Sequence, residues 1–449
     1  MHVDLLRRQH RVLTLGALLV AVAIVAGSGR TTAAPAALRG EITFLLSEDP
    51  DALQGFKDLV AAFAKIQPDV KVTLHNVPDG GEFLKRLAAD FAANTPPDVF
   101  EINYRPFGQF AIKGVLEPVD DYMSRSSVVK TGDFYPAALE AFKFKGQQYC
   151  LPQNLSSLVV YYNKKLFADA NVSPPHAGWT WHDFLSAARA LTKDTNGDGK
   201  PDQYGAGIAP QIIRLAPFIW AHGGELVDDL NRPTQLTLDA GPALEALRWF
   251  VDLQVKEHVV PSKADEATES SQSRFQHGTL AMFFQSRVIT PELRQTITNF
   301  EWDVAPMPGD KTVATILHSD GYCITRGSKN KDAAWAFTEF ANGPEGQQTI
   351  VASGRTVPSI KSIAESPAFA NAPPPASSKI YTEMAPHIRR VPIMTTWLQI
   401  EDVMNREIKR AFYGDATVEE AVRAAVQDTR EQFQQNLQDL AHTLSLQSR

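Results

Sequence analysis

Residues 41–77, EITFLLSEDPDALQGFKDLVAAFAKIQPDVKVTLHNV, place an amphipathic stretch between two apolar runs. EITFLL and VKVTLHNV are short and rich in apolar and β-branched residues, so each predicts a strand. From Leu53 to Ile66 the apolar residues recur at spacings of three and four, which predicts a helix. A strand, a helix and a strand in this order favour a parallel pair with a crossover helix, so the stretch predicts an α/β fold.

The same alternation continues beyond this stretch. Apolar residues from Phe83 to Phe91 mark a second helix that ends before two prolines, and DVFEI at 98–102 predicts a third strand. Ligands of open parallel sheets bind beyond the carboxyl ends of the strands. We therefore expect the segments 47–49 and 103–105, which follow the first and third strands, to contribute to a ligand site.

The remainder of the chain contains more helix than strand. Between residues 179 and 300 the pattern is mostly helical, and WDVAPMP and GYCITR predict a return to strand. Two later helices have cap residues: Asn330 precedes one, and in the other Thr417 stands at capping-box spacing from Glu420.

The first forty residues predict export. Arg7, Arg8 and Arg11 precede an apolar run at 12–26, and small residues follow. This order is typical of a cleaved signal peptide, and the run is shorter than the roughly 20 residues of a membrane span. A retained signal anchor is the alternative. Because no cysteine lies near the leader, a lipoprotein anchor is excluded, and we expect a periplasmic or secreted protein.

Composition and motifs narrow the function classes. The chain has 449 residues, is 44% hydrophobic and 21% charged, and carries a formal net charge of −7. It has no basic run interleaved with aromatic residues, so we expect no nucleic-acid partner. It also lacks the G-x-S-x-G, H-E-x-x-H, phosphate-loop and Cys-x-x-Cys motifs, so no enzyme class is indicated.

The stretch LTKDTNGDGKPDQYG at 191–205 has the oxygen spacing of a calcium loop. An EF-type loop has a Gly at position six and a bidentate Glu at position twelve. Here Gly199 fits, but the twelfth residue is Gly205, so the strongest ligand is missing. The alternative is a turn whose side chains bond their own backbone. No cofactor is required, and a structural calcium ion would have as candidate ligands Asp194, Asn196, Asp198, Lys200 and Asp202.

Aromatic residues at strand ends and in loops favour a sugar ligand. Ring faces stack on the C–H faces of sugars, while neighbouring polar side chains bond the hydroxyls. The alternative for each ring is packing in the core. The aromatic residues concerned are Trp220, Trp302, Trp397, Tyr104, Tyr161 and Tyr322.

Five segments, in order, resemble the extracellular solute-binding proteins of the sugar-binding ABC-importer class. They are PDVFEINYRPFGQFAIKGVLEPVDDYM, the stretch from LPQNLSSLVVYYN to KPDQYG, FQHGTLAMFF, APMPG and GSKNKDAAWAFTEFANGPEGQ. The resemblance covers nearly the whole chain after the leader. It implies a two-lobed α/β fold of the periplasmic-binding-protein type (type II-like), with the ligand in a cleft between lobes joined by a multi-segment hinge.

The resemblance also implies lobe boundaries. After an export and processing region at 1–39, it places lobe one at 40–151 plus 325–355, lobe two at 154–320 plus 358–449, and the hinge near 150–153, 320–324 and 355–358. The only cysteines, Cys150 and Cys323, would then lie in neighbouring crossings. A disulfide and two separate buried thiols remain alternatives.

The resemblance also implies ligand contacts, which are transferred from the family to this chain position by position. In IMTTWLQI, Trp397 takes the place of a stacking tryptophan of maltose-binding members. After AMFF, where those members have a second stacking tryptophan, this chain has QSRVI, and Arg287 would supply hydrogen bonds instead. The expected ligand-binding residues are Glu48, Asp49, Asn103, Tyr104, Arg105, Asn154, Arg287, Asp320, Tyr322, Arg355 and Trp397.

The resemblance implies a binding protein rather than an enzyme. It would capture a sugar or sugar-like solute, such as a carbohydrate or polyol, outside the cytoplasmic membrane, and deliver it as a monomer to the permease subunits of an ABC transporter. Three alternatives remain open at this point: an exported lyase or glycosidase, a sensor lobe that feeds a membrane receptor, and binding of glycerophosphodiesters or polyols by the same fold.

Overall fold

The computed structural model of the chain describes residues 38–371 and 373–447. The export signal predicted for the first 39 residues therefore lies almost entirely outside the described residues. Among those that are described, no helix is both long enough and apolar enough to cross a membrane.

A five-stranded mixed sheet contains the three strands predicted near the amino terminus. β1 pairs in parallel with β2 and with β3, and β13 is antiparallel to β3. The predicted α/β arrangement is confirmed, and the two predicted helices are α1 (Pro50–Ile66) and α2 (Gly80–Ala92). In sheet order the strands are β2 (Val70–Asn76), β1 (Gly40–Leu46), β3 (Val99–Asn103), β13 (Asp320–Ile324) and β6 (Cys150–Pro152).

Aromatic side chains hold α13 (Lys331–Ala341) against this sheet. The ring of Phe337 lies 5.1 Å from that of Phe44 in β1 and 5.3 Å from that of Phe63 in α1, centroid to centroid. All three rings are buried. A segment almost 300 residues downstream of β1 thus completes the core on one face of the first sheet.

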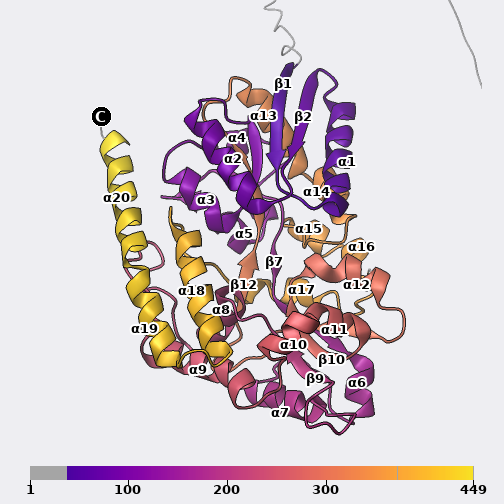
Figure 1. Cartoon of the computed structure of the whole chain (residues 1–449). Helices are drawn as coiled ribbons and strands as arrows, with labels where there is room; N and C mark the ends of the chain where they lie inside the picture. Colours follow the sequence, from indigo (N-terminus) through magenta and orange to yellow (C-terminus); the bar gives the residue numbers. More distant parts are fainter. Residues whose placement is uncertain (1–37, 372, 448–449) are drawn as a thin grey trace, which may run out of the picture. The chain divides into compact units, whose positions relative to one another are not determined.

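A four-stranded sheet forms the second lobe. β8 is antiparallel to both of its neighbours, β10 and β11, whereas β9 is parallel to β10. Figure 1 shows β1, β2 and α1 toward one end of the described residues and β9, β10 and α7 toward the other. In sheet order the strands are β11 (Trp302–Ala305), β8 (Val159–Asn163), β10 (Leu280–Gln285) and β9 (Tyr204–Gly207).

Helices make up most of the remaining chain. Between the first two sheets in sequence lie α3 (Tyr104–Ala111), α4 (Asp120–Arg125) and α5 (Pro136–Glu140), with the hairpin β4 (Lys143–Phe144) and β5 (Gln147–Gln148). Around the second sheet lie α6 (Lys164–Asp169), α7 (Trp181–Leu191), α8 (Ile212–Ala221), α9 (Gly241–Val255), α10 (Lys263–Thr268), α11 (Ser271–His277) and α12 (Thr290–Thr296). After α13 follow α14 (Pro344–Val351), α15 (Lys361–Ala364), α16 (Pro367–Ala370), α17 (Ile380–Glu383), α18 (Trp397–Phe412), α19 (Val418–Asp428) and α20 (Arg430–Gln447).

The two cap predictions have different outcomes. Thr417 and Glu420 form the predicted capping box at the start of α19. Asn330 does stand at the N-cap of α13, but its side chain makes no cap hydrogen bond. Its amide instead donates to the carbonyl oxygen of Glu41 at 2.9 Å, so a tertiary contact replaces the local cap.

The three segments that the resemblance assigns to the crossings between the lobes lie side by side. The backbone amide of Gln153 donates to the backbone carbonyl of Asp320 at 2.7 Å. The backbone amide of Leu155 donates to the backbone carbonyl of Val357 at 2.8 Å. These bonds bring together the three hinge segments expected from the resemblance, whereas the lobe boundaries themselves remain a prediction. A small third sheet adjoins the crossings, formed by β14 (Ile388–Arg389), β12 (Thr315–His318) and β7 (Ser156–Ser157).

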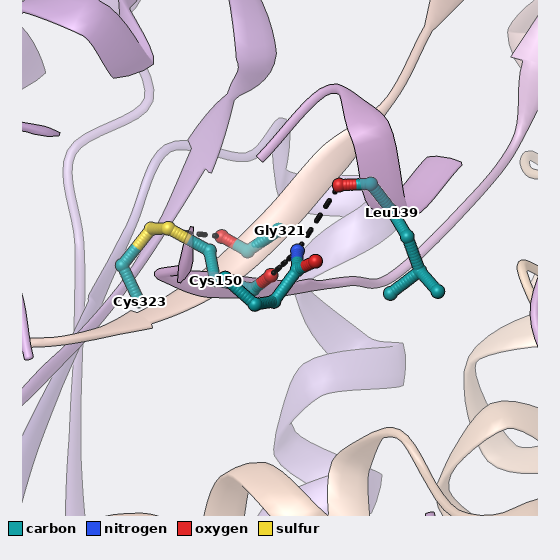
Figure 2. The surroundings of a disulfide bond; sticks show 5 residues. Leu139, Cys150, Gly321 and Cys323 are labelled. Atoms are coloured by element: carbon teal, nitrogen blue, oxygen red, sulfur yellow. Dashed lines mark hydrogen bonds between the residues drawn. A yellow bond between two sulfur atoms is a disulfide. The ribbon is translucent and has the colours of Figure 1, made fainter. Parts of the chain in front are cut away.

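A disulfide joins the first two crossings. Cys150 in β6 and Cys323 in β13 are directly opposite in the antiparallel pair, with Cα atoms 4.3 Å apart. Figure 2 shows the bond next to Gly321. Both cysteines are fully buried, so tertiary structure decides between the two alternatives in favour of the bond.

Candidate functional site

Polar side chains from both sides of the crossings meet at the carboxyl end of β3. Asp320 is the central acceptor: its Oδ1 accepts from Nδ2 of Asn103 at 3.0 Å, and its Oδ2 accepts from Nδ2 of Asn154 at 2.9 Å. Asn103 also caps α3, because its Oδ1 accepts the backbone amide of Arg105. One end of β3 thus connects three of the expected site residues.

Acidic side chains crowd the first-lobe part of this site. Burial, and then the charges of Asp320 and Asp49, raise the pKa of Glu48 to about 7, while Arg355 opposes the shift. Glu101 is buried, and desolvation followed by the Glu48 and Asp320 charges raises its pKa well above 4.5. Protonated carboxyls at neutral pH would act as hydrogen-bond donors as well as acceptors.

Arg355 and Asp49 lie at the edge of the acidic group. Nη2 of Arg355 is 3.4 Å from Oδ2 of Asp49, whose side chain is largely exposed. An ion pair of this exposure contributes little to stability, so both groups remain free to exchange partners with a ligand.

Arg105 links α3 to α18. Its Nη1 is 2.6 Å from Oε1 of the buried Glu401, and its Nε donates to Oδ1 of Asn103 at 3.1 Å. This pair neutralises the Arg105 charge and joins α18 to α3 of the first lobe.

The second lobe contributes Arg214 and His318. Nη2 of Arg214, on α8, donates to Oε1 of Gln285 at the end of β10, at 2.7 Å. His318 is the last residue of β12, and burial, then Arg214 and Arg105, lower its pKa well below 6.5. The imidazole is therefore neutral near pH 7.

Several buried polar atoms of this region have no hydrogen-bond partner among the described residues. Such atoms are uncommon in folded proteins because an unpaired buried polar group is costly. Their concentration here is what a site for hydroxyl-rich ligands would show. They are Oε1 of Glu101, Oδ1 of Asn154, Oγ of Ser157, Nη1 of Arg214, Nε2 of His318 and the hydroxyl of Tyr322.

Other expected site residues are placed deeper in the core. Arg287 donates to the carbonyl of Gly354 at 3.1 Å, and its guanidinium lies over the rings of Phe369 and Tyr381. Trp397, the first residue of α18, has no exposed surface and belongs to the hydrophobic core, and Tyr104, the first residue of α3, is 2% exposed. Stacking of a sugar on Trp397 stays a prediction, because it requires this ring to become uncovered.

Sequence reasoning missed Glu101, Arg214, His318 and Glu401. Two of them carried a local signal. Glu101 interrupts the apolar strand VFEIN, and Arg214 interrupts the apolar helix IIRLAPFIWA, so each is a charge at a position that the periodicity assigns to the core. Nothing local distinguishes His318 or Glu401, because their significance depends on partners distant in the sequence.

The loop at 194–202 has the hydrogen bonds of a turn. Oδ2 of Asp202 accepts from the backbone amides of Thr195 and Asn196, at 2.8 and 3.1 Å. The Asp194 carboxylate accepts from the amides of Gly197 and Gly199. Across the described residues, no three acidic, histidine or cysteine side chains are grouped as metal ligands. The oxygens thus point at the loop's own backbone, and calcium binding stays a prediction.

Sequence comparison finds binding proteins that are similar to this chain over most of its length. A binding protein of Brucella abortus is 26% identical over 414 residues, which cover 90% of this chain and 96% of the other. The maltotriose-binding protein of Pyrococcus abyssi is 26% identical over 341 residues, covering 74% and 70% of the two chains.

Solved structures are similar over most of the described residues. The ABC substrate-binding protein from Listeria monocytogenes in complex with cycloalternan has a TM-score of 0.78 at 26% identity, covering 88% of this chain and 98% of that one. The sugar-binding protein MalE from Xanthomonas citri has a TM-score of 0.79 at 22% identity, with the same two coverages. These similarities confirm the α/β periplasmic-binding-protein fold, with mixed sheets in two lobes.

The model of the bacterial extracellular solute-binding protein family matches residues 48–348, more than half of the chain. Members of this family bind solutes for ABC transporters and are not enzymes, so the exported lyase or glycosidase is set aside. With the two-lobed fold and the polar site beside the crossings, the match leads to one conclusion: this chain belongs to the bacterial extracellular solute-binding protein family.

Proposed function

We propose that this protein captures a sugar or sugar-like solute outside the cytoplasmic membrane and delivers it to the permease subunits of an ABC importer. The observation that carries the proposal is the group of unpaired polar atoms around Asp320, which hydroxyl groups would satisfy. A ligand with many hydroxyls gains most where the protein's own polar groups lack partners.

The relatives support the same class of ligand. One similar protein is a maltotriose-binding protein and another was solved with cycloalternan, and both share 26% of their aligned residues with this chain. A mannitol-binding protein of Pseudomonas aeruginosa, 25% identical over 313 residues, extends the range to polyols. The permease partner follows from the family, and we expect a monomer.

A thermal-shift screen over sugars, polyols and glycerophosphodiesters tests the proposal. A ligand at 100 times its dissociation constant stabilises the folded protein by about 2.7 kcal/mol, which is readily measured. We expect at least one member to raise the melting temperature and to be recovered unchanged after long incubation. A screen in which no member stabilises the protein would contradict the proposal.

A site variant shows where the ligand binds. Asp320→Asn keeps the side-chain volume but presents an amide to Asn103 and Asn154, so we expect at least a tenfold loss of affinity for the hit. Asp169→Asn, in an exposed ion pair with Lys165, is the matched control and should bind normally. If the two variants bind the hit with equal affinity, the ligand does not bind at Asp320.

A further inference from the structure

Arg214 is a buried cation without a counter-charge. Its residue exposure is 7%, on a helix whose other residues are almost all apolar. Nη2 donates to the neutral amide of Gln285, and Nη1 is buried with no hydrogen-bond partner among the described residues. Within that same part of the chain, no carboxylate lies within ion-pair distance of it.

Two other arginines expected in the site have a group that compensates the charge. Arg105 is paired with Glu401 at 2.6 Å. Arg287 is enclosed by the faces of two aromatic rings, whose centroids lie 4.2 and 4.8 Å from its guanidinium carbon. Aromatic faces attract a cation, and a carboxylate neutralises one. Arg214 has neither among the residues that the structure describes, so its positive charge is unmatched there.

The surroundings of Arg214 keep the charge unmatched. Desolvation, and then the nearby Arg105, lower the pKa of Arg214 to about 10, so it is still protonated at neutral pH. His318, which both arginines influence, is neutral and leaves Nε2 unpaired. Leaving a buried charge unpaired destabilises a folded protein, and a ligand that supplies the missing partner recovers this cost on binding.

We infer that Arg214 binds an anionic group on the transported solute, so that the ligand is an acidic sugar or sugar-like molecule bearing a carboxylate or a phosphate. The inference rests on the proposed function and narrows its ligand class. The anionic group would lie against Arg214 and His318, from α8 and β12. The hydroxyls would bond the polar group around Asp320, Asn154 and Glu101, and the raised pKa of Glu101 favours a neutral carboxyl there, which would not repel an anion.

A paired ligand screen tests the inference on the full chain. Each neutral sugar of the screen above is set beside its uronate and its 6-phosphate, with sodium phosphate and sodium chloride alone as anion controls. We expect the acidic members to bind at least tenfold more tightly than their neutral partners by calorimetry. The uronate and phosphate arms identify which anionic group is preferred.

The outcomes separate this inference from the proposed function. Neutral sugars that bind as tightly as their acidic partners would overturn the acidic-ligand inference and leave the sugar-binding proposal standing. Stabilisation by phosphate alone, with no gain from a sugar moiety, would overturn both. Failure of every member, neutral and acidic, would count against the proposed function and against the inference that rests on it.

Variants of Arg214 test whether the preference for acidic over neutral ligands comes from this side chain. Arg214→Gln removes the charge and should lower affinity for the acidic hit at least tenfold, reducing the ratio between acidic and neutral affinities. Arg214→Lys keeps the charge and should retain part of the preference. Arg248→Gln, on the exposed side of α9 and paired with Glu419, is the matched control.

If folded Arg214→Gln keeps the wild-type ratio between acidic and neutral affinities, Arg214 does not belong to the site. If that variant does not fold, the wild-type ratio decides the ligand class and Arg214→Lys tests the residue.

Discussion

At the scale of the residue, the candidate site is built from ionisable side chains that the fold shields from solvent. Glu48, Glu101 and Asp320 lie close enough for each to raise the pKa of a neighbour, and only Arg355 opposes this in the case of Glu48. Such crowding costs stability when the carboxyls ionise. It persists in proteins where the same groups are needed to bind something else.

The raised pKa of Glu48 predicts a pH-dependent stability. Between its ordinary value of 4.5 and about 7, folded Glu48 holds a proton that the unfolded chain has released, so stability falls as pH rises through this window. Above about pH 7 this loss is complete. Because Glu48 is half-buried and partly screened, we expect its share to be about 1–3 kcal/mol.

Urea unfolding at pH 5 and pH 8 measures this effect. The fall in unfolding free energy between the two should be smaller in Glu48→Gln than in the wild type. Glu101 contributes in the same direction in both proteins, and because the Glu48 charge raises its pKa, the difference between the two proteins measures Glu48 together with its effect on Glu101. If the unfolding free energy falls by the same amount in both proteins, the pKa of Glu48 is not raised in the folded state.

Substitutions of Trp397 distinguish a role in core packing from a role in stacking on the ligand. Because its ring is fully buried, we expect Trp397→Ala to lower the unfolding free energy by about 3–5 kcal/mol. Trp397→Phe keeps an aromatic ring in the core and should retain most of the ligand affinity. If this conservative variant folds normally but loses more than tenfold in affinity by calorimetry, the ring contacts the ligand in the bound state.

At the scale of the element, the crossings position the site. β6 and β13 are short strands that pair side by side, and the Ser359 hydroxyl ties the third crossing to the carbonyl of Pro152 at 2.5 Å. Asp320 is the first residue of β13, so the register of this pairing determines where the central acceptor lies. The disulfide fixes that register covalently.

The disulfide predicts a redox-dependent stability. Denatured, unreduced protein should contain no titratable thiol, because Cys150 and Cys323 are bonded. The cysteines are 173 residues apart, and closing so long a loop restricts the unfolded chain, so reduction should cost about 2–4 kcal/mol. Thiol counting and unfolding with and without reductant measure the two effects. Two thiols per chain before reduction would rule the bond out.

The loop between α7 and β9 predicts indifference to calcium. Since its carboxylates accept hydrogen bonds from their own backbone, the loop is satisfied without a metal. We expect the same melting temperature with chelator and with added calcium. Asp202→Ala, which removes the acceptor of several of these bonds, should lower it in both conditions. A melting temperature that rises with calcium and falls with chelator would establish a metal site.

At the scale of the whole molecule, the candidate site contains residues from both lobes. Asn103 and Arg105 come from the first lobe, whereas Arg214 and Gln285 come from the second. A ligand that bonds residues of both sheets favours conformations in which they are close together, since it stabilises only those states that it contacts on both sides.

Ligand binding is therefore expected to close the lobes. The crossings are few and neighbouring, as in hinged proteins that close around a ligand. Small-angle X-ray scattering should give a smaller radius of gyration when the hit from the screen is present. The Asp320→Asn variant, at the same ligand concentration, should show a smaller change. A radius that is unchanged while calorimetry shows saturation would argue against closure.

Local sequence determined the elements and the family. Hydrophobic periodicity predicted β1, α1, β2, α2 and β3, and the capping box predicted the start of α19, because each depends on neighbours within a few residues. The resemblance in five ordered segments predicted the fold class for the same chain. It also placed Asn103, Arg105, Asn154 and Asp320 near one another, which the structure shows for these four.

Only the tertiary structure decided which side chains meet and which are buried. Asn103 and Asp320 are 217 residues apart, and Arg105 and Glu401 are 296 apart, so no local pattern relates them. The burial of Trp397, the bond between Cys150 and Cys323 and the unmatched charge of Arg214 likewise arise from long-range packing. Periodicity shows that a residue faces inward, but the partner it meets there depends on how distant segments fold together.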